Sequence, residues 1–226
     1  MAQAIPMYSM SATLLPKGLS DQLDASMRKF WWSPKSKAGS YWSPMSWSSL
    51  CLPQKEDGLG FRKFWDFNQA LLSKLGWWIL SRKNCLCIKV LRAKYKIRDN
   101  WLAHHSPSNA SPFWKSMMGT KHLIAKATCL LVGNGNSIRT WIDPWIPNLP
   151  SFIPTPKVDA NLDIALVVSQ LLIPNRSSWD IPKLSLLFEE HVVELIQKFS
   201  IPSCPMDDSW SWTATNSGFF SVNSAY

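Results

Sequence analysis

The chain has 226 residues and a formal net charge of +9, and 46% of its residues are hydrophobic. This content is sufficient for a folded core, but no apolar run reaches the length of about 18 residues that a membrane-spanning helix requires. The five cysteines lack the spacing of a disulfide framework, and the first residues do not have the pattern of a signal peptide. These features argue against a membrane protein or a secreted protein, so we expect an intracellular one.

The apolar residues of the first half recur at the spacing of α-helices. Four helices are predicted, at about 16–32, 63–81, 86–95 and 113–127. In the first of them, Ser20 is the expected N-cap, and the Ser33-Pro34 pair ends the helix. In the second, one apolar stripe contains Phe67, Leu71, Leu75 and Trp78. A loop rich in serine, proline and glycine joins these two helices.

From residue 128 the pattern changes to short β segments. Segments 128–132 and 137–141 flank the turn Gly133-Asn134-Gly135-Asn136, which predicts a β-hairpin over about 128–141. A second hairpin is predicted over about 209–222. Between the two hairpins lie five prolines within 144–156 and two helical patterns, at about 163–173 and 182–199. The expected fold class is therefore mainly α, with two small β-hairpins and irregular, proline-rich connections.

The positive charge lies in the first part of the chain. Residues 1–100 contain 16 lysines and arginines against 6 aspartates and glutamates, whereas residues 101–226 contain 8 against 9. A basic surface attracts acidic partners, of which a phosphate backbone is the simplest. The charge therefore favours a nucleic-acid partner for the first half. A basic surface without a specific partner is the alternative.

One aspartate pair, Asp207 and Asp208, superficially matches the two carboxylates with which polymerases hold magnesium. Such carboxylates lie on a tight hairpin, whereas the preceding segment 201–205 contains two prolines, which a central strand does not tolerate. The residues nearest to a zinc site lack its paired spacing, and they are Cys85, Cys87, His104 and His105. No motif of a catalytic nucleophile is present either. We therefore predict no enzyme activity, no metal and no cofactor.

Basic residues alternate with aromatic residues over 28–98. Lysines and arginines can neutralise phosphates while aromatic rings stack on bases or sugars, so helices of this composition can lie along a nucleic-acid backbone. The residues expected to contact phosphates are Lys63, Lys74, Arg92, Lys94 and Lys96, with Arg28 and Lys29 as second choices. A helical core with a basic solvent face is the alternative interpretation.

A series of short motifs follows along nearly the whole chain. It comprises the stretches 2–11, 15–17, 29–32, 47–51, 58–62, 67–74, 94–95, 132–141, 143–145 and 210–226. In order and spacing these motifs resemble the carboxy-terminal part of plant non-LTR (LINE-type) retrotransposon polyproteins. They are also similar to short mitochondrial reading frames of plants that derive from such elements. The chain departs from the family at Asp57-Gly58, where two glycines are frequent, and matches it only loosely over 157–207.

The resemblance implies a thumb-like helical unit at residues 1–127. It implies a connection unit with hairpins at 128–226, cut before a zinc-binding segment, and it puts the polymerase palm before the start of the chain. The expected function is that of a reverse-transcriptase fragment without its catalytic palm. This fragment would keep a sequence-independent affinity for RNA or an RNA–DNA duplex, in the nucleus or the mitochondrion. A protein-interaction or scaffold module and a remnant reading frame without function remain the alternatives.

Overall fold

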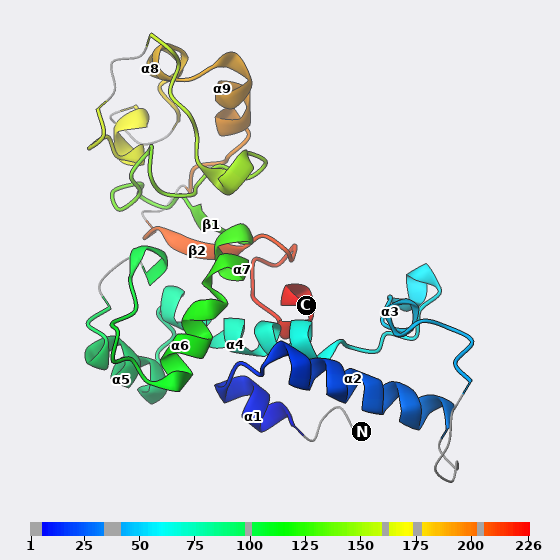
Figure 1. Ribbon diagram of the computed structural model, residues 1–226. Helices are drawn as coiled ribbons and strands as arrows, with labels where there is room; N and C mark the ends of the chain where they lie inside the picture. The colour runs from blue at the N-terminus through cyan, green and yellow to red at the C-terminus, as the bar shows by residue number, and fades with distance from the viewer. Residues whose placement is uncertain (1–5, 34–41, 98–100, 160–162, 174–177, 203–205) are drawn as a thin grey trace. The chain divides into compact units, whose positions relative to one another are not determined.

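The computed structural model describes residues 6–33, 42–97, 101–159, 163–173, 178–202 and 206–226 (Figure 1). The chain divides into two compact units, of which unit 1 is Met1–Ile124 with Ser221–Tyr226 and unit 2 is Ala125–Phe220. Most of the regular structure in the described residues is helical, and two short strands form a single antiparallel sheet. The predicted class, mainly α with a small β component, is confirmed. The assignment of thumb and connection roles to parts of the chain stays a prediction.

Unit 1 is helical (Figure 1). Its helices are α1 (Met7–Ala12), α2 (Lys17–Trp32), α3 (Trp47–Leu50), α4 (Phe64–Leu80), α5 (Leu86–Lys94), α6 (Pro112–Gly119), the first residues of α7 (Lys121–Lys126) and α10 (Val222–Ala225), with short 3-10 turns at Gln54–Glu56 and Trp101–Ala103. The helices predicted at 16–32, 63–81 and 86–95 are confirmed. The helix predicted at 113–127 is interrupted at Thr120, whose hydroxyl donates to the carbonyl oxygen of Met117 at 2.8 Å. Ser20 is not an N-cap, because α2 already begins after Pro16 and Ser20 lies buried inside it.

The central element of unit 1 is α4, against which α1, α2, α5, α6 and α10 pack. Its interior face is buried over most of its length, and Phe64, Phe67 and Leu71 form a cluster with Met10 of α1. The last turn of the chain returns to this cluster, where Val222 packs against it. Phe67 and Leu71 of the predicted apolar stripe thus belong to the core around α4, whereas Leu75 and Trp78 of the same stripe are only partly buried.

A buried amide, Asn68, fixes the connection between α1 and α2 to α4. Its Nδ2 donates to the carbonyl oxygens of Met10 at 2.6 Å and Thr13 at 3.0 Å, and its Oδ1 accepts from the N–H of Leu15 at 2.7 Å. The Asn68 side chain is fully buried. It therefore supplies the hydrogen bonds that a helix end and the following turn lose when they are removed from water.

Unit 2 contains little regular structure. Its elements are β1 (Thr128–Leu131), the 3-10 turns Pro150–Phe152 and Val168–Leu171, α8 (Ile181–Leu187), α9 (Glu190–Gln197) and β2 (Ser209–Trp212). A core of buried side chains joins these segments, and Trp145 and Phe188 are among its largest members. The helix predicted at 182–199 is split into α8 and α9, because Phe188 between them has an extended backbone. The helix predicted at 163–173 is reduced to a single 3-10 turn.

The strands of unit 2 pair with each other rather than with local partners. β1 and β2 are antiparallel, with Thr128 opposite Trp212 and Leu131 opposite Ser209. The hairpins predicted at 128–141 and 209–222 are therefore wrong in their pairing, although both of their first strands exist. Arg139, in the expected return strand of the first hairpin, forms an isolated bridge with Val167 instead. The second return segment leads into α10.

The physical reason for the different pairing is a carboxylate inside the predicted turn. One oxygen of Asp208 accepts from the N–H groups of Gly133 and Gly135, both at 2.8 Å. The other oxygen accepts from the N–H of Ser137 at 3.0 Å and from its hydroxyl at 2.7 Å. Gly135 has a φ of +69°, which glycine adopts easily, and a Cβ on Gly133 would lie 2.4 Å from the carbonyl oxygen of Met206. The loop thus wraps the carboxylate instead of reversing the chain tightly.

Candidate nucleic-acid interface

The basic residues of unit 1 are concentrated after the middle of α4. From Phe67 to Ile124 the sequence contains ten lysines and arginines and one acidic residue, Asp99. Six of these lysines have exposed side chains, and they are Lys74, Lys83, Lys89, Lys94, Lys96 and Lys115. A surface with so few carboxylates has a positive potential that attracts polyanions.

Two of the exposed lysines share one aromatic ring at the C-terminal end of α4. The ammonium nitrogen of Lys74 lies 4.9 Å from the ring centroid of Trp78, and that of Lys83 lies 3.8 Å from it. Lys74 and Trp78 are four residues apart on α4, so they lie on the same face of the helix. Cation–π attraction of this kind holds a flexible lysine side chain near the ring.

The three basic residues predicted around α5 have different surroundings. The guanidinium of Arg92 donates to the carbonyl oxygen of Ile79 at 3.2 Å, which links α5 to the last turn of α4. Lys94 and Lys96 are exposed, and the ammonium nitrogen of Lys94 lies 5.5 Å from the ring centroid of Tyr95. Arg92 therefore has a structural contact in addition to any external one, whereas both lysines are open to solvent.

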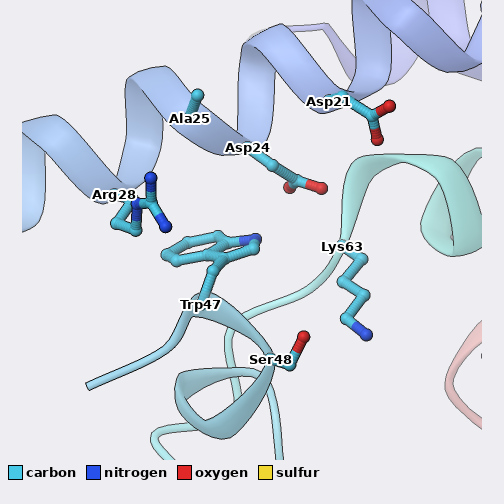
Figure 2. A pocket seen from close by; sticks show the side chains of 7 residues that line it. All are labelled: Asp21, Asp24, Ala25, Arg28, Trp47, Ser48 and Lys63. Carbon is cyan, nitrogen blue, oxygen red and sulfur yellow. The ribbon is translucent and has the colours of Figure 1, made fainter.

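Arg28 and Lys63 lie elsewhere in unit 1, at a cavity of about 330 Å³. Figure 2 shows Asp24 and Arg28 of α2 directed towards Trp47. The complete lining consists of Asp21, Asp24, Ala25, Arg28, Trp47, Ser48 and Lys63. Two carboxylates accompany the two cationic side chains, so this cavity has no marked excess of positive charge. Lys29 is exposed on α2 and does not line it.

The acidic side of this cavity supports the start of α4. One oxygen of Asp24 accepts from the N–H of Phe64, the first residue of α4, at 3.1 Å. Burial raises the pKa of Asp24, and the hydrogen bond from Phe64 opposes the rise. The N–H of Lys63 donates to the hydroxyl oxygen of Tyr226 at 2.9 Å. The Asp24 contact stabilises an end of α4, because a negative charge is favourable near a helix N-terminus.

The structure therefore divides the seven predicted contact residues. Lys74 and Arg92 are associated with the last turns of α4, Arg28 and Lys63 with the cavity beside α2, and Lys29, Lys94 and Lys96 with open surface. Lys83 is not among the contact residues predicted from the sequence, although it lies only five residues after Trp78. Its role depends on how α4 ends, and the apolar periodicity carries no information about that turn.

Within the described parts of the chain, no three histidine, cysteine, aspartate or glutamate side chains come together as a metal site would require. Burial raises the pKa of the Cys51 thiol to about 11, so this buried cysteine is neutral. No helix in the same parts of the chain is both long and apolar enough to cross a bilayer.

Two proteins of Arabidopsis thaliana are similar to this chain. A protein with the name "Putative ribonuclease H protein" is 32% identical over 235 residues, which cover 99% of this chain and 36% of that protein. An "Uncharacterized mitochondrial protein" is 32% identical over 145 residues, which cover 63% of this chain and 93% of that protein. The chain belongs to the family of this mitochondrial protein. It spans about a third of the length of the first relative.

No family model matches the chain, and no solved structure does. The two relatives agree with the coarse form of the predicted resemblance, which is a plant reading frame derived from a retrotransposon.

Proposed function

We propose that the chain is a reverse-transcriptase fragment without its catalytic palm and that it binds RNA or an RNA–DNA duplex without sequence specificity. The observation that carries the proposal is the charge of unit 1 between Phe67 and Ile124, with ten basic residues against one acidic residue. Exposed lysines neutralise phosphates and release condensed counterions, and this contribution does not depend on base sequence. The name of one relative, a ribonuclease H protein, is consistent with a nucleic-acid partner. The nucleus or the mitochondrion is the proposed location.

We propose no reaction for the chain itself. The carboxylate pair Asp207 and Asp208 has a superficial likeness to a polymerase centre, but the two oxygens of Asp208 are engaged by four hydrogen bonds within unit 2. A two-metal site needs carboxylate oxygens that face the ions. Asp208 is better suited to stabilising the loop 133–137 than to catalysis.

The test is a salt titration of binding to a labelled RNA–DNA hybrid duplex, with the full chain shown to be folded by circular dichroism. We expect the logarithm of affinity to fall linearly with the logarithm of salt concentration, by about 0.9 for each phosphate contact. The double variant Lys94→Glu/Lys96→Glu should bind more weakly and show a shallower slope.

The matched control for this test is Lys157→Glu/Lys198→Glu, which makes the same charge change at two exposed lysines of unit 2. Equal losses of affinity in the two double variants would contradict an interface on unit 1. Absence of binding by the folded wild-type chain at low salt would contradict the proposed function as a whole.

A protein-interaction module is the second candidate, because large apolar side chains are exposed at the end of α2. Phe30 is 62% exposed and Trp31 is 46% exposed. Exposed apolar side chains that adjoin one another are typical of protein interfaces. This alternative predicts a partner whose binding is lost in Phe30→Ser/Trp31→Ser and is insensitive to salt.

A further inference from the structure

The C-terminal end of α4 is closed by a turn in which an arginine takes the place of glycine. The N–H of Arg82 donates to the carbonyl oxygen of Ile79 at 3.2 Å, and the N–H of Lys83 donates to that of Trp78 at 2.9 Å. These two bonds define a Schellman motif, whose left-handed residue is usually glycine. Here that residue is Arg82, with a φ of +52°. The turn directs the chain back along the helix, so Lys83 reaches the ring of Trp78.

The end of α5 has the same construction with another basic residue. The N–H of Lys96 donates to the carbonyl oxygen of Ala93 at 3.4 Å, and the N–H of Ile97 donates to that of Arg92 at 3.0 Å. Lys96 also has a φ of +52°. Two successive helices therefore keep a long cationic side chain in a conformation that glycine would adopt with less strain.

The side chains at the end of α4 form a compact cationic group. Both ammonium nitrogens, of Lys74 and Lys83, lie within 5 Å of the centroid of one indole ring. No ion pair joins either lysine to a carboxylate within the part of the chain that the structure describes, and the sequence from 67 to 98 contains no acidic residue. Both ammonium groups therefore lie at one ring, and no carboxylate of the described residues neutralises them.

The helix dipole acts against an anion at this end, since the last carbonyl groups of a helix carry partial negative charge. At α4 these carbonyls are occupied. Those of Trp78 and Ile79 accept the N–H groups of the turn, and that of Ile79 also accepts from the guanidinium of Arg92. This engagement of the carbonyl groups weakens the unfavourable effect of the dipole on an anion at this site.

We propose that Lys74, Trp78 and Lys83 form a binding site for one phosphodiester group of a nucleic-acid backbone. This inference rests on the proposed function, and it identifies one phosphate contact by which the chain binds the nucleic acid. The two ammonium groups can donate to the two non-bridging oxygens of the phosphate, which are charge-assisted hydrogen bonds. Trp78 restricts both lysine side chains in advance, so less side-chain freedom is lost on binding.

The experiment compares Lys74→Gln and Lys83→Gln with Lys198→Gln, which removes the same charge from an exposed lysine of unit 2. Affinity for the labelled hybrid duplex is measured as a function of salt for each full-length variant. We expect each of the first two variants to bind several-fold more weakly and to reduce the salt slope by about 1, as the loss of one phosphate contact does. Lys198→Gln should remain close to the wild-type chain.

A third variant, Trp78→Leu, keeps both charges and removes the ring. Its affinity should fall while its salt slope stays at the wild-type value, because the number of neutralised phosphates is unchanged. Circular dichroism establishes that this variant is folded.

If Lys74→Gln and Lys83→Gln bind as Lys198→Gln does, the site is refuted, while steep salt dependence of the wild-type chain still supports the proposed function. If the wild-type chain does not bind the duplex, the proposed function itself fails, and this inference fails with it.

Discussion

Unit 1 and unit 2 use their charged residues in different ways. In unit 2, carboxylates bind backbone N–H groups of irregular segments and of the first turn of α8. Asp143 accepts from Arg139 at 2.8 Å, Asp163 from Ala165 at 2.9 Å and Asp180 from Lys183 at 3.1 Å. A chain without long helices or strands must satisfy its backbone groups by side chains, and short acidic residues are suited to this task.

Unit 1 satisfies most of its backbone within helices and therefore needs fewer side chains for the purpose. Its basic residues after Phe67 have almost no carboxylates to pair with. The carboxylates of unit 2 are therefore engaged by its own backbone, whereas the exposed lysines of unit 1 remain open to external anions. One polar side chain in each unit tests this comparison. Asn68 of unit 1 and Asp208 of unit 2 both form hydrogen bonds with backbone groups that lie far away in the sequence.

The largest expected effect comes from Asn68→Ala in unit 1. The substitution leaves two carbonyl oxygens and one N–H of the connection between α1 and α2 without their partner. Since the amide is fully buried, we expect the free energy of unfolding to fall by about 3 kcal/mol. Urea unfolding measures the change. Gln69→Ala, at the next position of α4, is the control and should cost less than about 1 kcal/mol.

The second effect is a loss of stability in Asp208→Ala, by about 2 kcal/mol. Four hydrogen bonds to the loop 133–137 disappear, two of them to glycine N–H groups. Asp207→Ala removes the neighbouring carboxylate, which accepts a single bond from Asn134 at 3.3 Å. It should change stability by less than about 0.5 kcal/mol. Similar losses in both variants would mean that net charge, rather than the loop, is responsible.

The third effect is a gain of stability, by about 1 kcal/mol each, in Arg82→Gly and Lys96→Gly. Both residues have left-handed backbones at helix ends, where glycine avoids the steric cost. Lys89→Gly is the control, because it puts glycine into the interior of α5 and should cost about 1 kcal/mol. Thermal unfolding distinguishes the opposite signs. Destabilisation in all three variants would refute the helix ends described here.

The positions of α2, α4 and α5 could be predicted from the sequence, because each of these helices has its own apolar periodicity, whereas the short helices α1 and α3 were not predicted. The C-terminal ends of α4 and α5 could not be predicted. A Schellman turn is normally recognised in a sequence by its glycine, but these two turns have Arg82 and Lys96 at that position. Asp57 is a similar case. It also has a left-handed backbone, with a φ of +58°. Aspartate tolerates this conformation better than most residues.

The strand pairing of unit 2 could not be predicted for a different reason. The Gly133-Asn134-Gly135-Asn136 sequence is typical of a tight hairpin turn, but the loop is determined by Asp208, which is distant in sequence. Periodicity describes only neighbouring residues, and long-range hydrogen bonds lie outside it. The basic residues of the candidate site were largely visible in the sequence, whereas the joint approach of Lys74 and Lys83 to Trp78 depends on the turn that ends α4.

The smallest expected effect is a pH dependence of unit 1 that originates at His104. Burial lowers the pKa of His104, and the positive charges of Lys121 and His105 act in the same direction. The folded chain therefore favours the neutral ring. The stability that His104 contributes is complete above the unfolded pKa of about 6.5 and is lost as the pH falls through the lower folded pKa. The midpoint of urea unfolding should fall between about pH 7 and pH 5 by a larger amount in the wild-type chain than in His104→Gln. His105→Gln, at the exposed neighbouring position, should keep most of the wild-type dependence. An equal reduction in both variants would assign the effect to the charge of the surface rather than to the partly buried ring of His104.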